Sequence, residues 1–377
     1  MKNNGVRIFI TGDFYAGNRT EELIFKGFLN DIFNDLLPLI RRSDIAVTNL
    51  ESPLTDSDLA IQKTGPAIKA NPKAIEALKF AGFNLLTLAN NHIMDYGFRG
   101  LKDTLELCEN NNIDYCGVGK NLESASKVYY KEINATIIAF INLTENEFST
   151  TNGDEPGTNP LDPVLNYYSI KEAKGNADFV FVIIHGGHEM YNLPSPRMKK
   201  TYRFFIDSGA DIVIGHHPHC FSGFERYNGG IIFYSLGNFV FDSTDDKNIN
   251  WYFGFAVNFI IANNRLTHEI IPIEQSKFKP GVRILRKKEN ENFYHSIEAL
   301  NSIIADDKLL SEKFEQFSIK SFPIYNHFLQ PYSSKFLHIL RRKGYLRSIL
   351  GRKKRLLYLN LIRCESHRDM LIKTLMK

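Results

Sequence analysis

Three histidines within four residues, in the segment Gly215-His216-His217-Pro218-His219, are the clearest candidates for chemistry in this sequence. The segment follows Asp211-Ile212-Val213-Ile214, whose β-branched residues predict a short buried strand. Neutral imidazole is a favoured ligand for divalent metals such as Zn, Mn and Fe, and the fixed backbone of Pro218 could aim His217 and His219 into one site. The alternative is a turn whose histidines simply contact water.

Polar residues also end five other predicted strands. Ligands collect at the carboxyl ends of strands in open α/β sheets, so these clusters are expected to meet in one crevice. Each cluster alone has a simpler explanation as a cap, a turn or a solvated loop, and only their joint occurrence favours a shared site. The clusters are Asp13, Glu51, Asn91 with His92, His185, and Ser235 with Asn238.

The residue types in these clusters suit metal chemistry. The carboxylates of Asp13 and Glu51 can bridge two cations, and the amide oxygen of Asn91 can complete a site built on histidines. Two metals about 3.5–4 Å apart can activate a water and hold the transferring group. One or two ions of Mn, Zn or Fe are therefore expected, with the ligands Asp13, Glu51, Asn91, His185, His217 and His219.

The catalytic candidates are His92 and Asp95. His92 lies beside a predicted ligand and could donate a proton to a leaving group, and Asp95, three residues later, could orient its ring. Arg197 begins a basic segment that could hold carboxylates, although a solvated helix face explains this segment equally well. The candidate substrate contacts are Glu189, Arg197, Ser235 and Asn238.

The composition is that of an ordinary soluble globular protein. The chain has 377 residues, of which 43% are hydrophobic and 23% charged. A net charge of +4 gives no reason to expect nucleic-acid binding, and the four cysteines lack the spacing of a disulfide or zinc framework. No apolar stretch approaches the ~18 residues of a membrane span, so a cytoplasmic location is predicted, with a peripheral membrane contact left open.

Strands alternate with helices from residue 6 to 275, which predicts an α/β domain with largely parallel strands. Apolar residues at helical spacing predict a helix over 21–42, with a kink or early stop at Pro38. The apolar run 179–184 suits a strand buried on both faces. The polar segment 142–163 is predicted to be a long loop.

Residues 276–377 are predicted to form a mainly helical extension, because charged residues rise and strand signals fade. Residues 335–377 are basic and carry an apolar helical stripe. Such a helix can bind an anionic membrane or an acidic partner. The favoured interpretation is that its apolar face packs on the same chain.

Six motifs, in this order, resemble the CapA family of capsule and poly-γ-glutamate synthesis proteins over roughly residues 6–275. The resemblance implies a calcineurin-like metallophosphoesterase fold, which is a four-layer α/β/β/α sandwich with a metal centre at the strand ends. It also implies the metal ligands given above, with His92 as the catalytic acid. The motifs are Gly12-Asp13, Asn49-Leu50-Glu51, Asn90-Asn91-His92-x-x-Asp95-x-Gly97, His185-Gly-Gly-His-Glu189, Gly215-His-His-Pro-His219 and Tyr234-Ser-Leu-Gly-Asn-Phe239.

The sequence departs from the superfamily pattern at two positions. Metallophosphoesterases usually begin with Asp-x-His, but here Asp13 is followed by Phe14 and Tyr15. Their bridging aspartate is replaced by Glu51, as is usual in CapA-like chains. The missing histidine leaves open whether one or two metals bind, and the family pattern gives His216 only a supporting role.

The resemblance implies a metal-dependent hydrolase or transferase that acts on an amide or ester bond of an acidic, peptide-like polymer. An envelope-polymer synthase complex is then the expected partner. Two alternatives stay open. One is a phosphoesterase or a peptide epimerase on the same fold, and the other is a non-catalytic scaffold that binds an anionic polymer through the basic C-terminal region.

Overall fold

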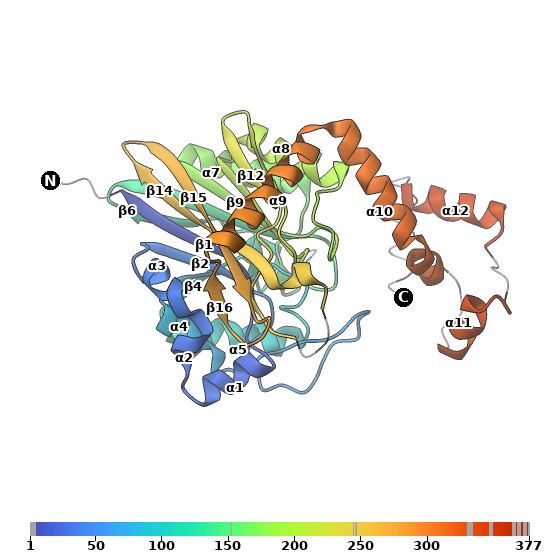
Figure 1. Ribbon diagram of the computed structural model, residues 1–377, viewed down its shortest axis with the longest axis horizontal. Helices are drawn as coiled ribbons and strands as arrows, with labels where there is room; N and C mark the ends of the chain where they lie inside the picture. Colours follow the sequence, from blue (N-terminus) through green and yellow to red (C-terminus); the bar gives the residue numbers. More distant parts are fainter. Residues whose placement is uncertain are drawn as a thin grey trace. The chain divides into compact units, whose positions relative to one another are not determined.

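The computed structural model describes residues 5–151, 153–243, 245, 247–329, 335–346, 350–363, 367, 371 and 375. The chain divides into two compact units, Met1–Ser311 and Glu312–Lys377. The first unit contains both large sheets and all the predicted site residues (Figure 1).

The first sheet is organised around β1, whose carboxyl end carries Asp13. Strands β1 to β4 are parallel neighbours, and β14 to β16 continue the sheet with antiparallel pairing on the other side of β1. The parallel order brings the ends of β1, β2 and β3 to one edge. The strands are β1 (Val6–Tyr15), β2 (Ile45–Leu50), β3 (Leu85–Thr87), β4 (Asp114–Cys116), β13 (Asn238–Phe241), which pairs with β1, β14 (Phe253–Ala262), β15 (Arg265–Gln275) and β16 (Val282–Ile284).

The second sheet has the order β11-β12-β10-β9-β7-β6. Its central strand β9 is buried at every residue, as the uninterrupted apolar run predicted. Within the segment predicted to be a loop, β8 forms a small pair with β5. The strands are β6 (Tyr129–Ile133), β7 (Thr136–Thr144), β9 (Phe179–His185), β10 (Ile212–His216), β11 (Phe224–Tyr227) and β12 (Gly230–Phe233), and the pair is β5 (Val118–Gly119) with β8 (Gly157–Thr158).

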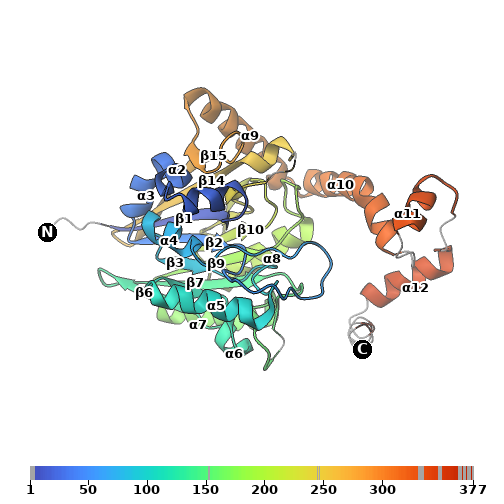
Figure 2. The ribbon, with the colours of Figure 1, turned by 90° about the horizontal axis from the view of Figure 1, so that it is seen from below.

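The two sheets pack face to face, and helices cover their outer faces, which confirms the predicted four-layer α/β/β/α sandwich (Figure 2). Alternate residues of β1 show why. Ile8 and Ile10 point into the core between the sheets, while Phe9 points into the core beneath the helices. This alternation follows from the two-residue period of a strand.

The predicted helix over 21–42 is wrong, because the chain forms several short helices there. Gly27 and Asn34 have φ values of 75° and 45°, and the left-handed conformation interrupts a right-handed helix. Helices of the first sheet are α1 (Arg19–Phe25), α2 (Leu29–Phe33), the 3₁₀ helix η1 (Asn34–Leu36), α3 (Leu37–Arg41), α4 (Ala74–Ala81) and α5 (Gly97–Asn110). The remaining helices up to β14 are α6 (Leu122–Ala125), α7 (Pro163–Asn176), α8 (Pro196–Ser208) and the 3₁₀ helix η2 (Ile249–Tyr252).

Residues 276–311, which the sequence assigned to the extension, belong to the first compact unit. Phe293 and Ile297 of α9 (Lys287–Ala305) are buried in the core between the sheets, and β16 extends the first sheet. The helices that follow are α10 (Asp307–Phe328), α11 (Lys335–Arg342) and α12 (Arg352–Arg363). Within the described part of the chain, no helix is long and apolar enough to cross a membrane.

Candidate metal centre

Asp13 reaches the centre because β1 is distorted immediately before it. The register between β1 and β2 shifts between Ile10 and Asp13, a bulge of the kind that re-aims side chains. A Cβ atom on Gly12 would lie 1.9 Å from the carbonyl oxygen of Gly237, so only glycine permits this approach. The backbone N–H of Asp13 then donates to Gly237 O at 3.2 Å, which fixes the strand end.

The loop after β10 presents His217 and His219 in unusual backbone conformations. Their φ values are 94° and 56°, a region that residues other than glycine seldom occupy and that is concentrated at functional sites. The N–H of His217 donates to Asp13 Oδ2 at 3.1 Å, and His219 Nδ1 lies 2.9 Å from Asn238 Oδ1. These contacts hold both imidazoles beside the carboxylate of Asp13.

Glu51 lies at the centre of the cluster, directly after β2. Its Oε1 is 3.5 Å from His185 Nε2 and 3.6 Å from His219 Nε2. Two groups of three side chains bring their potential ligand atoms within 4.8 Å of one another, namely Glu51, His185 and His217, and Asp13, Glu51 and His219. Because Glu51 belongs to both groups, its carboxylate is placed to bridge them.

The environment of Glu51 fits a bound cation. Neither carboxylate oxygen has a hydrogen-bond partner, although the side chain is completely buried. Burial, reinforced by the nearby carboxylates of Asp13 and Glu189, raises the pKa of Glu51 well above its usual value. A divalent cation would supply the positive charge and the ligand contacts that this carboxylate lacks.

The charge states of the other groups also suit metal ligands. Burial and the neighbouring His217 hold the pKa of His185 well below its usual value, and burial lowers the pKa of His219 to about 4. Neutral rings keep the lone pair that binds a metal. Burial alone would raise the pKa of Asp13, but its contact with His216 and the surrounding histidines lower it instead, which favours the carboxylate.

Asn91 and Asn49 connect the two sheets at this point. Asn91 Oδ1 lies 3.1 Å from His185 Nε2, so its amide sits beside the ligand atoms. Asn49 donates from Nδ2 to Asp13 Oδ1 at 2.8 Å and lies 3.3 Å from His185 Nδ1. We did not predict a role for Asn49, although its position two residues before Glu51 at a strand end was a usable signal.

His92, Asp95 and Lys63 form a polar group next to the ligands. His92 Nδ1 lies 2.6 Å from Asp95 Oδ2, and Lys63 Nζ lies 2.5 Å from Asp95 Oδ1 and 3.3 Å from His92 Nδ1. A carboxylate accepts hydrogen bonds, so the short contact favours a proton on Nδ1 and leaves Nε2 as the exchanging atom. Lys63 was missed because the segment around it has no helical or strand period.

Ser235 and Asn238, predicted to contact substrate, are both buried. The hydroxyl of Ser235 donates to Cys220 O at 2.8 Å. Asn238 contacts His219 and donates to Trp251 O at 3.2 Å. In this structure both side chains hold the histidine loop in place.

Glu189 and Arg197 lie at the periphery. Glu189 is exposed, yet its charge contributes to the raised pKa of Glu51. Arg197 Nη2 pairs with Glu145 Oε1 at 2.5 Å, and Glu145 also accepts the N–H of Gly187 at 2.9 Å. Arg197 therefore supports the loop that follows His185.

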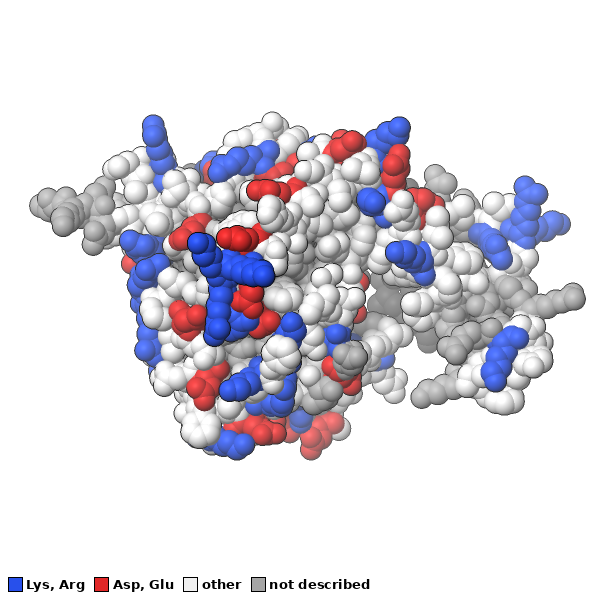
Figure 3. Space-filling model, viewed as in Figure 1, with Lys and Arg blue, Asp and Glu red and all other residues white. Residues whose placement is uncertain are grey.

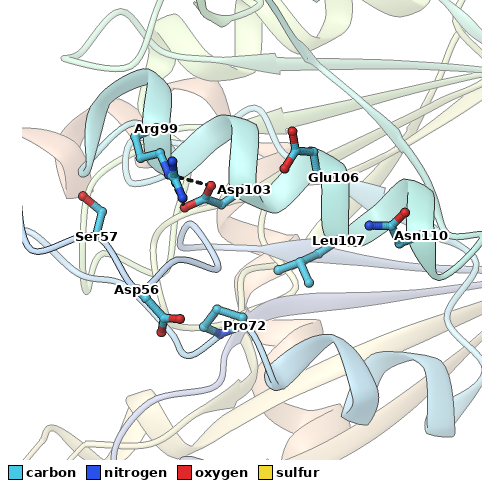
Figure 4. Close-up of a pocket in the computed structure, with 8 residues that line it drawn as sticks. All are labelled: Asp56, Ser57, Pro72, Arg99, Asp103, Glu106, Leu107 and Asn110. Carbon is cyan, nitrogen blue, oxygen red and sulfur yellow. Dashed lines mark hydrogen bonds and ion pairs between the residues drawn. The ribbon is translucent and has the colours of Figure 1, made fainter.

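The centre opens to solvent on one side. Asn91, His92, His217 and His219 keep 6–8% of their surface exposed, whereas Asp13 and Glu51 are fully covered. A separate surface pocket of about 520 Å³ lies along α5, where Arg99 pairs with Asp103 at 2.8 Å (Figure 4). That pocket contains none of the predicted site residues and is lined by Asp56, Ser57, Pro72, Arg99, Asp103, Glu106, Leu107 and Asn110.

The fold and the site together define an α/β/β/α sandwich with a cluster of carboxylate and imidazole side chains at its strand ends. A family model described as "Bacterial capsule synthesis protein PGA_cap" matches residues 7–243. The chain belongs to this family, which confirms the resemblance seen in the sequence motifs.

Two curated relatives are similar over the same region. The chain is 36% identical to "Capsule biosynthesis protein CapA" of Bacillus anthracis over 64% of its length and 38% identical to "PGA biosynthesis protein CapA" of Bacillus subtilis (strain 168) over 61%. It covers 61% and 62% of these relatives. A solved structure of a hypothetical protein from Thermus thermophilus has 14% identity and a TM-score of 0.44, over 74% of this chain and 100% of that one, and supports no argument about function.

Proposed function

We propose that this protein takes part in the synthesis of a capsular or related cell-envelope polymer of the poly-γ-glutamate type. The family and its two CapA relatives, whose names refer to capsule and PGA biosynthesis, support this role. The biochemical activity that we propose is a metal-dependent cleavage or transfer at an amide or ester bond of the polymer.

The observation that carries the proposed activity is the buried, unpaired carboxylate of Glu51 between two groups of potential ligands. Asp13, Glu51, Asn91, His185, His217 and His219 would hold one or two divalent ions. A bound cation would polarise the bond under attack and stabilise developing negative charge.

The residues beside the ligands provide the proton chemistry. Asp95 fixes the ring of His92 through the 2.6 Å contact, and Lys63 in turn fixes Asp95. His92 Nε2 would give a proton to the leaving amine or alcohol, and the slight exposure of His92 lets substrate approach it. Lys63 acts through Asp95 and is a positioning residue.

The test is an assay of the purified, metal-loaded full chain on poly-γ-glutamate, followed by chain length and by newly formed amines. His92→Gln should lower the rate by about 10²–10⁴-fold while the metal content stays the same. Unchanged turnover in this variant, or no turnover with either protein, would contradict the proposal.

The same preparations distinguish the other reactions of this fold. Hydrolysis of a chromogenic phosphodiester that depends on His92 would identify a phosphoesterase. Incorporation of deuterium from heavy water at a peptide Cα would identify an epimerase. Polymer binding without any of these reactions would identify a scaffold.

A further inference from the structure

The smaller unit, Glu312–Lys377, has a charge opposite to that of the first unit. It contains 15 Lys and Arg residues against 4 Asp and Glu, a formal charge of +11, whereas residues 1–311 carry −7. The small net charge of the whole chain conceals this division. So strong a basic charge in a short segment favours an anionic partner.

The described part of this unit also exposes large apolar side chains. Ile319, Phe322 and Tyr325 of α10 recur at intervals of three residues, and each is more than half exposed. Phe336 and Ile339 of α11 are 67% and 48% exposed. Residues spaced by three or four lie on one face of a helix, so these apolar side chains form helical stripes.

Helix α12 places cations and apolar side chains next to each other. All of its first four residues are exposed cations, namely Arg352, Lys353, Lys354 and Arg355, and the basic side chains of this unit are drawn in blue in Figure 3. Positive charge at a helix N-terminus opposes the helix dipole, so these four cations do not serve the stability of the helix. The exposed apolar residues that follow are Leu356, Leu357, Leu359 and Ile362.

From this juxtaposition we infer that the C-terminal unit docks on the surface of an anionic lipid bilayer. The cations would contact lipid headgroups, and the apolar side chains of α10, α11 and α12 would enter the boundary of the acyl chains. A soluble polyanion would satisfy the charges but would leave the apolar side chains in water. The inference does not depend on the proposed catalytic activity.

The experiment measures flotation of the full chain with vesicles of phosphatidylcholine alone or with about 30% phosphatidylglycerol. Binding should require the anionic lipid and should weaken strongly in about 0.5 M salt. A variant with Arg352, Lys353, Lys354 and Arg355 changed to Gln should bind at least about 10²-fold more weakly. The matched control changes four exposed lysines of the first unit, Lys120, Lys200, Lys279 and Lys288, to Gln and should bind as the wild type.

A second variant separates a bilayer from a soluble polyanion. Leu356→Ser, Leu359→Ser and Ile362→Ser together keep every charge but should weaken vesicle binding by about tenfold or more, because apolar burial is lost. Equal binding to neutral vesicles, no effect of the charge variant, or no effect of the apolar variant would each overturn the inference. Capture of poly-γ-glutamate or nucleic acid by the same cations without vesicle binding would also overturn it.

Discussion

At the scale of single residues, the buried carboxylate of Glu51 is the feature that most needs a cause. A buried charge with no hydrogen-bond partner is costly, and proteins normally pair such a group or bind a metal with it. The neighbouring imidazoles of His185 and His219 are held neutral, so they do not supply the missing positive charge. A divalent cation accounts for all three groups at once.

Lys63 gives a prediction at the same scale. Lys63→Met removes the ion pair that fixes Asp95 and should lower the turnover number by about 10-fold, without loss of metal. Lys63→Arg keeps the positive charge and should recover part of this loss. Steady-state kinetics with metal analysis of each variant measures the effect. Equal turnover of the Met variant and the wild type would show that Lys63 does not position the catalytic group.

At the scale of elements, strand ends account for most of what the sequence could predict. Asp13, Glu51, His185 and the histidine loop follow strongly apolar segments, so the strand pattern was sufficient to bring them together. Lys63 and the breaks at Gly27 and Asn34 depend on tertiary contacts and backbone conformations that leave no periodic signal. For the same reason, the burial of α9 could not be read from its polar sequence.

Helix α9 gives a prediction at this scale. Phe293 is 4% exposed, and its ring lies 4.7 Å from the ring of Phe221 and 5.9 Å from that of Phe255. Phe293→Ala should therefore lower the free energy of unfolding by about 3–5 kcal/mol. The control His295→Ala changes an exposed residue of the same helix and should have an effect within about 0.5 kcal/mol. Denaturant unfolding measures both, and equal effects would contradict the packing of α9 on the core.

At the scale of the whole molecule, the two sheets must stay together to keep the ligands assembled, and His268 lies where they pack. Its ring, on β15 of the first sheet, lies 5.5 Å from the ring of Phe233 and 6.0 Å from that of Phe224, both on the second sheet. Burial, with a contribution from Arg226, lowers the pKa of His268 below 6.5. The folded state therefore favours the neutral ring.

The sign of the resulting pH dependence follows from this lowered pKa. Above pH 6.5 the ring is neutral in both states, and as the pH falls below that value the unfolded chain takes up the proton more readily, so stability is lost. The free energy of unfolding should fall from about pH 8 to about pH 5, and His268→Gln should reduce that fall. Unfolding curves at the two pH values, under one metal condition, measure it. An identical fall in both proteins would exclude this contribution.

The central claim is that Glu51 joins two groups of ligands around bound metal. The direct measurement is the metal content of the purified full chain by inductively coupled plasma mass spectrometry, for the wild type, Glu51→Gln and the exposed control Glu189→Gln. We expect at least one divalent ion of Mn, Zn or Fe per wild-type chain, the same content in the control, and loss of most of the metal in Glu51→Gln. Metal-free wild type after loading with these ions, or full metal content in Glu51→Gln, would contradict the account.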